Sequence, residues 1–380
     1  MDIDTRSPTP SAAIDESLYS RQLYVLGKDA MLKMASSNVL IIGLKGLGLE
    51  IAKNVALAGV KSLSLYDPAP VELQDLSSQF FLSEHDIGKE RASATLPKLA
   101  ELNQYVPIDV VKDLTPELIK GYSVVVATDL PLSKQLELNE LTHANNIKFI
   151  SADVRGLFAQ AFVDFGEKFT IYDQTGEECK TGIVSDIEKD GTVTMLDDNR
   201  HGLEDGNYVK FTEVKGIEAI NSTPENEKVF KIKVLGPFAF QLEDFDPSWG
   251  TYEKGGLYTQ VKLPITESYQ DLKTQLAKPD LLTPDFAKFD RPIQLHLAFQ
   301  ALHQFRADHN DELPRPQNEE DALKIVKLTK SLVSKFSDYF ESEDDLNVDL
   351  IKQFSYGARG DLPGMVAFYG GLLAQEVLKA

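Results

Sequence analysis

The apolar positions of the first 170 residues alternate between two patterns. Short runs of consecutive apolar residues, which predict buried strands, are separated by segments in which apolar residues recur every three or four positions, which predicts helices. Buried strands that alternate with helices favour a parallel sheet covered on both faces. We therefore expect an α/β domain over residues 18–170. Its expected strands are 38–43, 62–67, 107–111, 123–129 and 147–154, and its expected helices are 46–58, 89–103 and 132–144.

The pattern changes at residue 171. Between residues 171 and 265, six short segments rich in β-branched and aromatic residues are separated by turns that contain glycine and aspartate. This spacing predicts a small antiparallel barrel or sandwich. Residues 266–355 return to a helical period, which predicts a helix bundle. Residues 1–17 are polar and have no apolar period, so we expect a flexible tail there.

The last segment predicts one more helix, which starts near Pro363. Asp361 is its expected N-cap. The helix is apolar almost all round, which predicts that it is buried. The chain then ends at Ala380 without a C-cap glycine or a polar tail. We therefore expect the sequence to be part of a longer protein.

Composition limits which kinds of molecule this protein can bind and which compartment it can occupy. The formal net charge is −20, which argues against nucleic acids and anionic membranes as partners because both repel an acidic chain. Cys179 is the single cysteine, so no intrachain disulfide can form and we expect a cytoplasmic or nuclear location. No apolar run approaches the roughly 18 residues that predict a membrane span.

A glycine-rich loop after the first strand is the strongest chemical signal from the residues alone. Gly43, Gly46 and Gly48 follow an expected strand and open an expected helix, which is the setting of a phosphate site. Asp67 lies where a ribose-binding acid is expected. However, Lys45 replaces a glycine at which the backbone has to approach a pyrophosphate, and its side chain would crowd that approach. At this point an NAD-dependent oxidoreductase remains one alternative.

Longer segments resemble the ubiquitin-activating enzyme family and its bacterial adenylyltransferase relatives. The run YSRQL at residues 19–23, taken with the glycine loop, carries the first part of the resemblance. The segment from GIVSDI to FTEVKG resembles the first catalytic-cysteine half-domain of that family, FDRPIQLHLAFQALHQF resembles its four-helix bundle, and RGDLPGMVAFYGGLLAQEVLKA resembles the return into its adenylation fold. The resemblance implies a Rossmann-like, ThiF-type adenylation fold at 18–170 and 356–380. The β-barrel domain (171–265) and the helix bundle (266–355) are insertions in it.

The family carries an inactive and an active adenylation half in one chain, and this sequence resembles the inactive one. Asp67 and Asp129 match acids of the active half. Other positions depart from its pattern, namely Lys45, Ala69, Ser78, Arg91 and Leu130. Because several phosphate-handling positions are lost together, we expect no catalytic residue, no metal ligand and no tightly bound cofactor in this chain. ATP and Mg²⁺ are then cofactors of the complete enzyme.

The resemblance also implies two sites of contact with other molecules. Arg21 matches an arginine that reaches the ATP bound in the active half. The turn after residue 196 presents Arg200, His201 and Glu204, of which we expect Arg200 and Glu204 to contact ubiquitin. The implied partners are ubiquitin, the active half of the same chain and ubiquitin-conjugating enzymes. The alternative is a stand-alone, non-catalytic subunit of a related modifier-activating heterodimer.

Overall fold

The computed structural model describes residues 17–196, 200–283 and 285–380 of the chain. These residues form two compact units. One, here called the α/β unit, combines Met1–Glu167 with Ser268–Ala380, and the other, here called the barrel unit, is Lys168–Glu267. The expected tail at 1–17 lies outside the described residues except for Ser17. No helix in the described ranges is both long enough and apolar enough to cross a bilayer.

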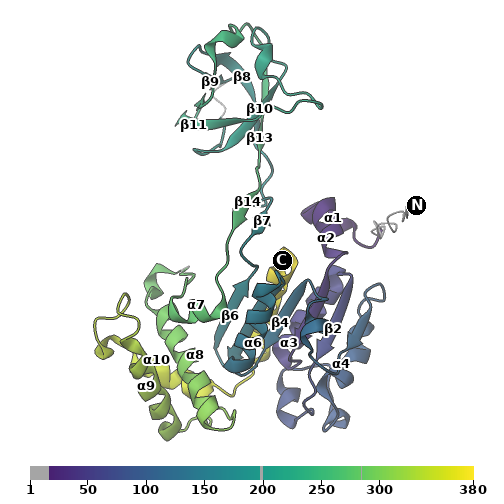
Figure 1. Cartoon of the computed structure of the whole chain (residues 1–380), viewed down its shortest axis with the longest axis vertical. Helices are drawn as coiled ribbons and strands as arrows, with labels where there is room; N and C mark the ends of the chain where they lie inside the picture. The colour runs from purple at the N-terminus through teal and green to yellow at the C-terminus, as the bar shows by residue number, and fades with distance from the viewer. Residues whose placement is uncertain (1–16, 197–199, 284) are drawn as a thin grey trace, which may run out of the picture. The chain divides into compact units, whose positions relative to one another are not determined.

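A six-stranded sheet forms the centre of the α/β unit (Figure 1). Its strand order is β3-β2-β1-β4-β5-β6, and β3, β2, β1, β4 and β5 pair in parallel. The strands are β1 (Asn38–Ile42), β2 (Ser62–Tyr66), β3 (Ile108–Val110), β4 (Val124–Thr128), β5 (Lys148–Arg155) and β6 (Phe158–Asp164). Every residue of β4 is buried, as expected for a strand covered on both faces. The predicted parallel sheet is confirmed.

Strand β6 is an addition to the predicted sheet. It pairs antiparallel with β5, and the turn between them contains Gly156 in the left-handed region (φ 61°). A side chain at this position would approach the carbonyl oxygen of Gly357 to 2.9 Å. The hairpin was not predicted because β6 is only half-buried and mixes polar with apolar residues.

Helices cover the sheet and form the bundle. The sheet-associated helices are α1 (Ser20–Leu26), α2 (Lys28–Met34), α3 (Gly46–Ala58), α4 (Arg91–Ala100), α5 (Pro116–Ile119), α6 (Leu132–Ala144) and α11 (Pro363–Lys379). The bundle segment contains α7 (Leu272–Ala277), α8 (Arg291–Asp308), α9 (Glu319–Val333) and α10 (Val348–Gly357). Leu297 and Phe299 of α8 pack with Phe354 of α10 in one buried cluster. The predicted helix bundle is therefore confirmed.

The barrel unit closes on itself. Its strands are β8 (Thr181–Ile187), β9 (Thr192–Met195), β10 (Tyr208–Thr212), β11 (Phe230–Gly236), β12 (Ala239–Leu242) and β13 (Leu257–Val261), in the closed order β10-β11-β12-β9-β8-β13. Phe211, Phe240 and Tyr258 fill the centre with almost no exposure. Strands β7 (Phe169–Ile171) and β14 (Ile265–Glu267) pair beside the two ends of this segment. Of the two predicted forms, a barrel or a sandwich, the structure has the barrel.

Candidate functional site

The glycine loop joins β1 to α3 at the carboxyl edge of the sheet. Gly43 has φ 89°, and a Cβ atom there would lie 2.3 Å from the carbonyl oxygen of Thr128. A Cβ atom on Gly48 would lie 1.9 Å from the carbonyl oxygen of Gly43, and one on Gly46 would lie 2.3 Å from Ser78 Oγ. Gly43 and Gly48 therefore allow backbone segments to pack closely, and Gly46 makes room for the side chain of Ser78, which together are the structural part of the nucleotide-loop pattern.

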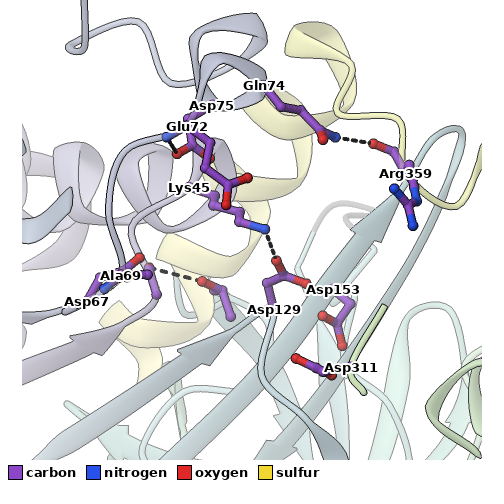
Figure 2. Close-up of polar contacts among 12 residues, drawn as sticks. Lys45, Asp67, Ala69, Glu72, Gln74, Asp75, Asp129, Asp153, Asp311 and Arg359 are labelled. Atoms are coloured by element: carbon purple, nitrogen blue, oxygen red, sulfur yellow. Dashed lines mark hydrogen bonds and ion pairs between the residues drawn. The ribbon is translucent and has the colours of Figure 1, made fainter. Parts of the chain in front are cut away.

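Lys45 of this loop pairs with an acid of its own chain. It occupies the N-cap position of α3, and its ammonium lies 2.7 Å from the carboxylate of Asp129, as Figure 2 shows. Burial alone would lower the pKa of Lys45, but the Asp129 carboxylate raises it above its ordinary value. Asp129, which the resemblance matches to an acid of the active half, is thus paired with the residue that stands in place of a loop glycine.

Three cationic side chains from different parts of the chain surround Asp129. Besides Lys45, it pairs with Arg155 of β5, and Arg306 of α8 lies 3.7 Å from it. Burial favours the neutral acid, but Arg155, Lys45 and Arg306 hold the pKa of Asp129 well below its ordinary value of 3.8. A carboxylate surrounded in this way already has the positive charge that a metal ion would otherwise supply.

Asp67 at the end of β2 is equally occupied. Its two oxygens accept hydrogen bonds from Arg91 Nη1 at 2.9 and 2.8 Å, from the Leu44 N–H at 2.8 Å and from the Ala69 N–H at 3.2 Å. A carboxylate offers about four acceptor positions, so none is left for the hydroxyls of a ribose. The residue at the expected ribose position is therefore a structural acceptor.

Arg91 uses its whole guanidinium inside the protein. Its Nε and Nη2 donate to Asp75 at 2.9 and 2.8 Å, and Nη2 also donates to the carbonyl oxygen of Pro70 at 3.1 Å. Together with the two bonds from Nη1 to Asp67, these contacts engage all three nitrogens of the guanidinium. Asp75 belongs to a short 3-10 helix, Leu73–Ser77, and sequence reasoning missed it because nothing in the run DLSSQF marks a buried acid.

A cleft of about 1210 Å³ remains above the strand ends. The glycine loop, Asp67, Asp129 and the bundle residue Arg306 are among the residues that line it.

The carboxylate of Asp361 interacts electrostatically with the charged residues of the same site. Burial, followed by the carboxylate of Asp129, raises its pKa. The prediction that Asp361 caps α11 is wrong, because Leu362 occupies the N-cap position and the acid instead faces this buried charge cluster.

Arg21 lies apart from the cleft. It belongs to α1, its side chain is exposed, and it is absent from the cleft lining. Among the residues that the structure describes, none forms a hydrogen bond or an ion pair with its side chain. The chain thus has an unpaired surface guanidinium at the position where the sequence predicted an arginine directed at another molecule.

Two kinds of comparison, with family models and with curated proteins, find similarity to ubiquitin-activating enzymes. Residues 188–262 match the model of the ubiquitin-activating enzyme E1 FCCH domain, and residues 263–333 match that of the ubiquitin-activating enzyme E1 four-helix bundle. Ubiquitin-activating enzyme E1 1 of Candida albicans is 59% identical over 100% of this chain and 36% of its own length. Ubiquitin-like modifier-activating enzyme 1 of Homo sapiens is 48% identical over 97% of this chain and 34% of its own length.

The chain is homologous to ubiquitin-activating enzyme E1. It spans about a third of the length of these E1 relatives. Among solved structures, Escherichia coli MccB is similar with 21% identity and a TM-score of 0.34, over 38% of this chain and 48% of its own. The matched E1 FCCH segment falls within the barrel unit, and the matched E1 bundle segment contains α7, α8 and α9.

The two predicted ubiquitin contacts lie at the surface of the barrel unit. Arg200 and Glu204 are both exposed, between β9 and β10. The prediction that His201 is presented with them is wrong. Its side chain is buried, its Nε2 lies 2.7 Å from the carbonyl oxygen of Gly236, and its Nδ1 accepts from the Leu203 N–H at 2.9 Å. His201 holds the turn while its neighbours remain free to contact another molecule.

Helix α11 of the E1 homologue also differs from the prediction. It packs against α3, and Gly370 sits so close to Glu50 that a Cβ atom there would lie 2.4 Å from the Glu50 Cβ. However, Phe368 and Leu372 on its other face are 69% and 43% exposed. The helix is apolar almost all round, yet the described residues cover only one of its faces, so the prediction of a buried helix is wrong for this chain.

Proposed function

We propose that this chain is the non-catalytic adenylation half of a ubiquitin-activating enzyme, joined to its first catalytic-cysteine half-domain and helix bundle. The active half would bind ATP and Mg²⁺, adenylate the ubiquitin C-terminus and pass it to a cysteine as a thioester. The observation that carries this proposal is the pairing of Asp129 with Lys45 and of Asp67 with Arg91 at the strand ends. Both acids that a nucleotide site would use are already neutralised from within.

The first consequence is that this chain binds no nucleotide tightly by itself. Binding Mg-ATP would require the breakage of buried ion pairs, and a lysine blocks the backbone approach to the phosphates. The same contacts argue against an NAD-dependent oxidoreductase, which needs the acid at position 67 for the ribose. Isothermal titration of the chain with Mg-ATP, and separately with NAD, is expected to give no heat of binding below millimolar concentration. Micromolar binding of either ligand would overturn the proposal.

The second consequence is an interface for the active half. The exposed apolar residues of α11 are accompanied on α1 by Tyr24 and Val25, which are 90% and 77% exposed. Burial of one large apolar side chain contributes about 1.5–3 kcal/mol, so each of these exposed side chains favours contact with another surface. We assign Phe368, Leu372 and the exposed face of α1 to contact with the active half.

The third consequence is a role for Arg21 in ATP binding. A guanidinium that reaches the triphosphate across an interface offsets negative charge and fixes its position, as arginine fingers do. In the complete enzyme, Arg21→Ala is expected to reduce ubiquitin-dependent ATP–pyrophosphate exchange on the order of 100-fold, below the range of stronger arginine fingers. Arg291→Ala, which removes another partly exposed arginine of the same unit, is the matched control. Unchanged exchange in Arg21→Ala would remove this role.

The barrel unit supplies part of the ubiquitin-binding surface in this proposal. Arg200 and Glu204 are exposed charges of opposite sign, and their simultaneous reversal (Arg200→Glu with Glu204→Arg) keeps the net charge unchanged. The double variant of the complete enzyme is expected to bind ubiquitin more weakly in calorimetry, by roughly 5-fold, since exposed ion pairs contribute up to about 1 kcal/mol. Equal affinity would exclude this surface. Ubiquitin-conjugating enzymes as later partners, and a cytoplasmic and nuclear location, belong to the same proposal.

A further inference from the structure

Arg21 belongs to a helix that is too short to be stable on its own. Helix α1 has seven residues, none of them fully buried, and Tyr19 at its N-cap makes no side-chain cap. Isolated helices shorter than about 12 residues are marginal in water. An arginine that has to meet a triphosphate on another half therefore needs an anchor outside the helix itself.

The ring of Tyr19 provides such an anchor at the end of α3. It packs over Gly59, where a Cβ atom would lie 2.7 Å from the ring, so the absence of a side chain makes the space. Gly59 also ends α3 in the left-handed conformation, with φ 84°. Any larger residue at this position would both strain the backbone and displace the ring.

Asn103 fixes the other end of the Tyr19 side chain. Its Nδ2 donates to Tyr19 Oη at 3.0 Å and to the carbonyl oxygen of Ala56 at 2.9 Å, while its Oδ1 accepts from the Tyr105 N–H at 3.1 Å. Asn103 is 9% exposed. The amide is therefore held by α3 and by the segment after α4, and it presents one N–H to the phenol oxygen in a fixed direction.

The spacing within α1 connects this anchor to Arg21. The Tyr19 carbonyl oxygen accepts from the Leu23 N–H at 2.9 Å, which closes the first turn, and Tyr19 and Leu23 both pack against a cluster of Met31, Met34 and Ala58. Residues four apart share one face of a helix, and a residue two positions after Tyr19 points away from that face. Arg21 is accordingly exposed.

We propose that Tyr19, held by Gly59 and Asn103, is a positioning residue that directs Arg21 towards the ATP of the active half. This inference rests on the role proposed above for Arg21. It assigns Tyr19 no contact with ATP. The tyrosine acts only through the helix that carries the arginine.

The test is a double-mutant cycle in the complete enzyme, followed by ubiquitin-dependent ATP–pyrophosphate exchange. Tyr19→Ala is expected to lower kcat/KM for ATP on the order of 10-fold, because small misplacements of a positioning group can cost up to about 100-fold. Tyr19→Phe keeps the ring and loses one neutral hydrogen bond, so a loss of roughly 5-fold or less is expected, with Asn103→Ala in the same range. Tyr105→Ala, an exposed tyrosine beside Asn103, is the matched control and should have no effect.

The cycle separates positioning from a general loss of structure. If Tyr19 acts through Arg21, Tyr19→Ala changes the exchange less than about 2-fold when Arg21 is already alanine. The positioning role is overturned if the losses of the two single variants multiply in the double variant. It is also overturned if Tyr19→Ala is fully active while Arg21→Ala is impaired. Either result leaves the proposed function intact. Full activity of Arg21→Ala overturns the arginine role, and the positioning role with it. Tyr19→Phe and Asn103→Ala keep the test decisive if Tyr19→Ala does not fold.

Discussion

Arg91 offers the sharpest test of the internally neutralised site. Its guanidinium is 4% exposed and lies between two buried carboxylates, those of Asp67 and Asp75, which are 8% and 3% exposed. Burial disfavours the charged guanidinium, but Asp67 and then Asp75 raise the pKa of Arg91, so the arginine remains charged. The substitution Arg91→Ala leaves both carboxylates buried without their cation.

The cost follows from the number of contacts that are lost. Removal of one partner of a buried pair destabilises a protein by about 3–5 kcal/mol, a large share of the roughly 5–15 kcal/mol of a typical domain. Arg91→Lys keeps the charge but has three donors on one nitrogen, which cannot reproduce the fork that reaches both acids. We expect a loss of about 1–3 kcal/mol for the lysine variant.

The two units allow an internal control in the same sample. All the α-helices described lie in the α/β unit, whereas the single tryptophan, Trp249, lies in the barrel unit and contacts Phe230 and Phe245. Urea unfolding followed by far-UV circular dichroism should shift to lower midpoints in Arg91→Ala. The fluorescence transition of Trp249 should remain in place. Arg291→Ala, which removes a partly exposed arginine, should cost less than about 1 kcal/mol.

One result would refute this reasoning. If Arg91→Ala shifts the circular dichroism transition no further than Arg291→Ala, the carboxylates at positions 67 and 75 do not depend on the arginine. The site would then be open to other cations. In that case Mg-ATP titration of the variant becomes the next measurement.

Three further predictions concern the loop, the charge cluster and the apolar face. Gly48→Ala forces a Cβ atom to 1.9 Å from the carbonyl oxygen of Gly43, and thermal melts should show the α/β unit destabilised by about 1–3 kcal/mol. The control is Gly364→Ala, whose Cβ atom would have no atom within 4 Å and which should be neutral or stabilising by up to about 1 kcal/mol. The folded pKa of Asp129 lies well below its ordinary value of 3.8, so its stabilisation is fully present above about pH 4 and decreases as the pH falls from there towards the folded pKa. Asp129→Asn should therefore be clearly less stable than the parent at pH 7, and the difference between their urea midpoints should be smaller at pH 3. An equal difference at both pH values would contradict the pairing. Phe368→Ser should change the free energy of unfolding of this chain by no more than about 0.5 kcal/mol, because the ring is exposed. The same substitution should lower thioester formation by the complete enzyme. Normal thioester formation would remove α11 from the interface.

The sequence by itself determined most of the strands and helices and the resemblance to ubiquitin-activating enzymes. The segments that became β1 and β4 are short, nearly continuous apolar runs, and the strands of the α/β domain alternate with segments of helical period. The short runs of the barrel are punctuated by glycine, so local patterns separated the α/β domain from the β-rich insertion. The loss of the phosphate-handling pattern was also readable, because Lys45 and Arg91 occupy definite positions relative to the glycine loop. These are properties of neighbouring residues, and a linear pattern reports them directly.

Only the tertiary structure decided what the changed residues do. Arg306 lies 177 positions after Asp129, and the two meet because the bundle helix α8 returns to the carboxyl edge of the sheet. The exposure of Phe368, the burial of His201 and the failure of Asp361 to cap α11 likewise depend on which segments arrive beside each residue. Ion pairing and burial are set by distance in space, and a local period carries no information about which distant segment will supply the opposite charge or the covering surface.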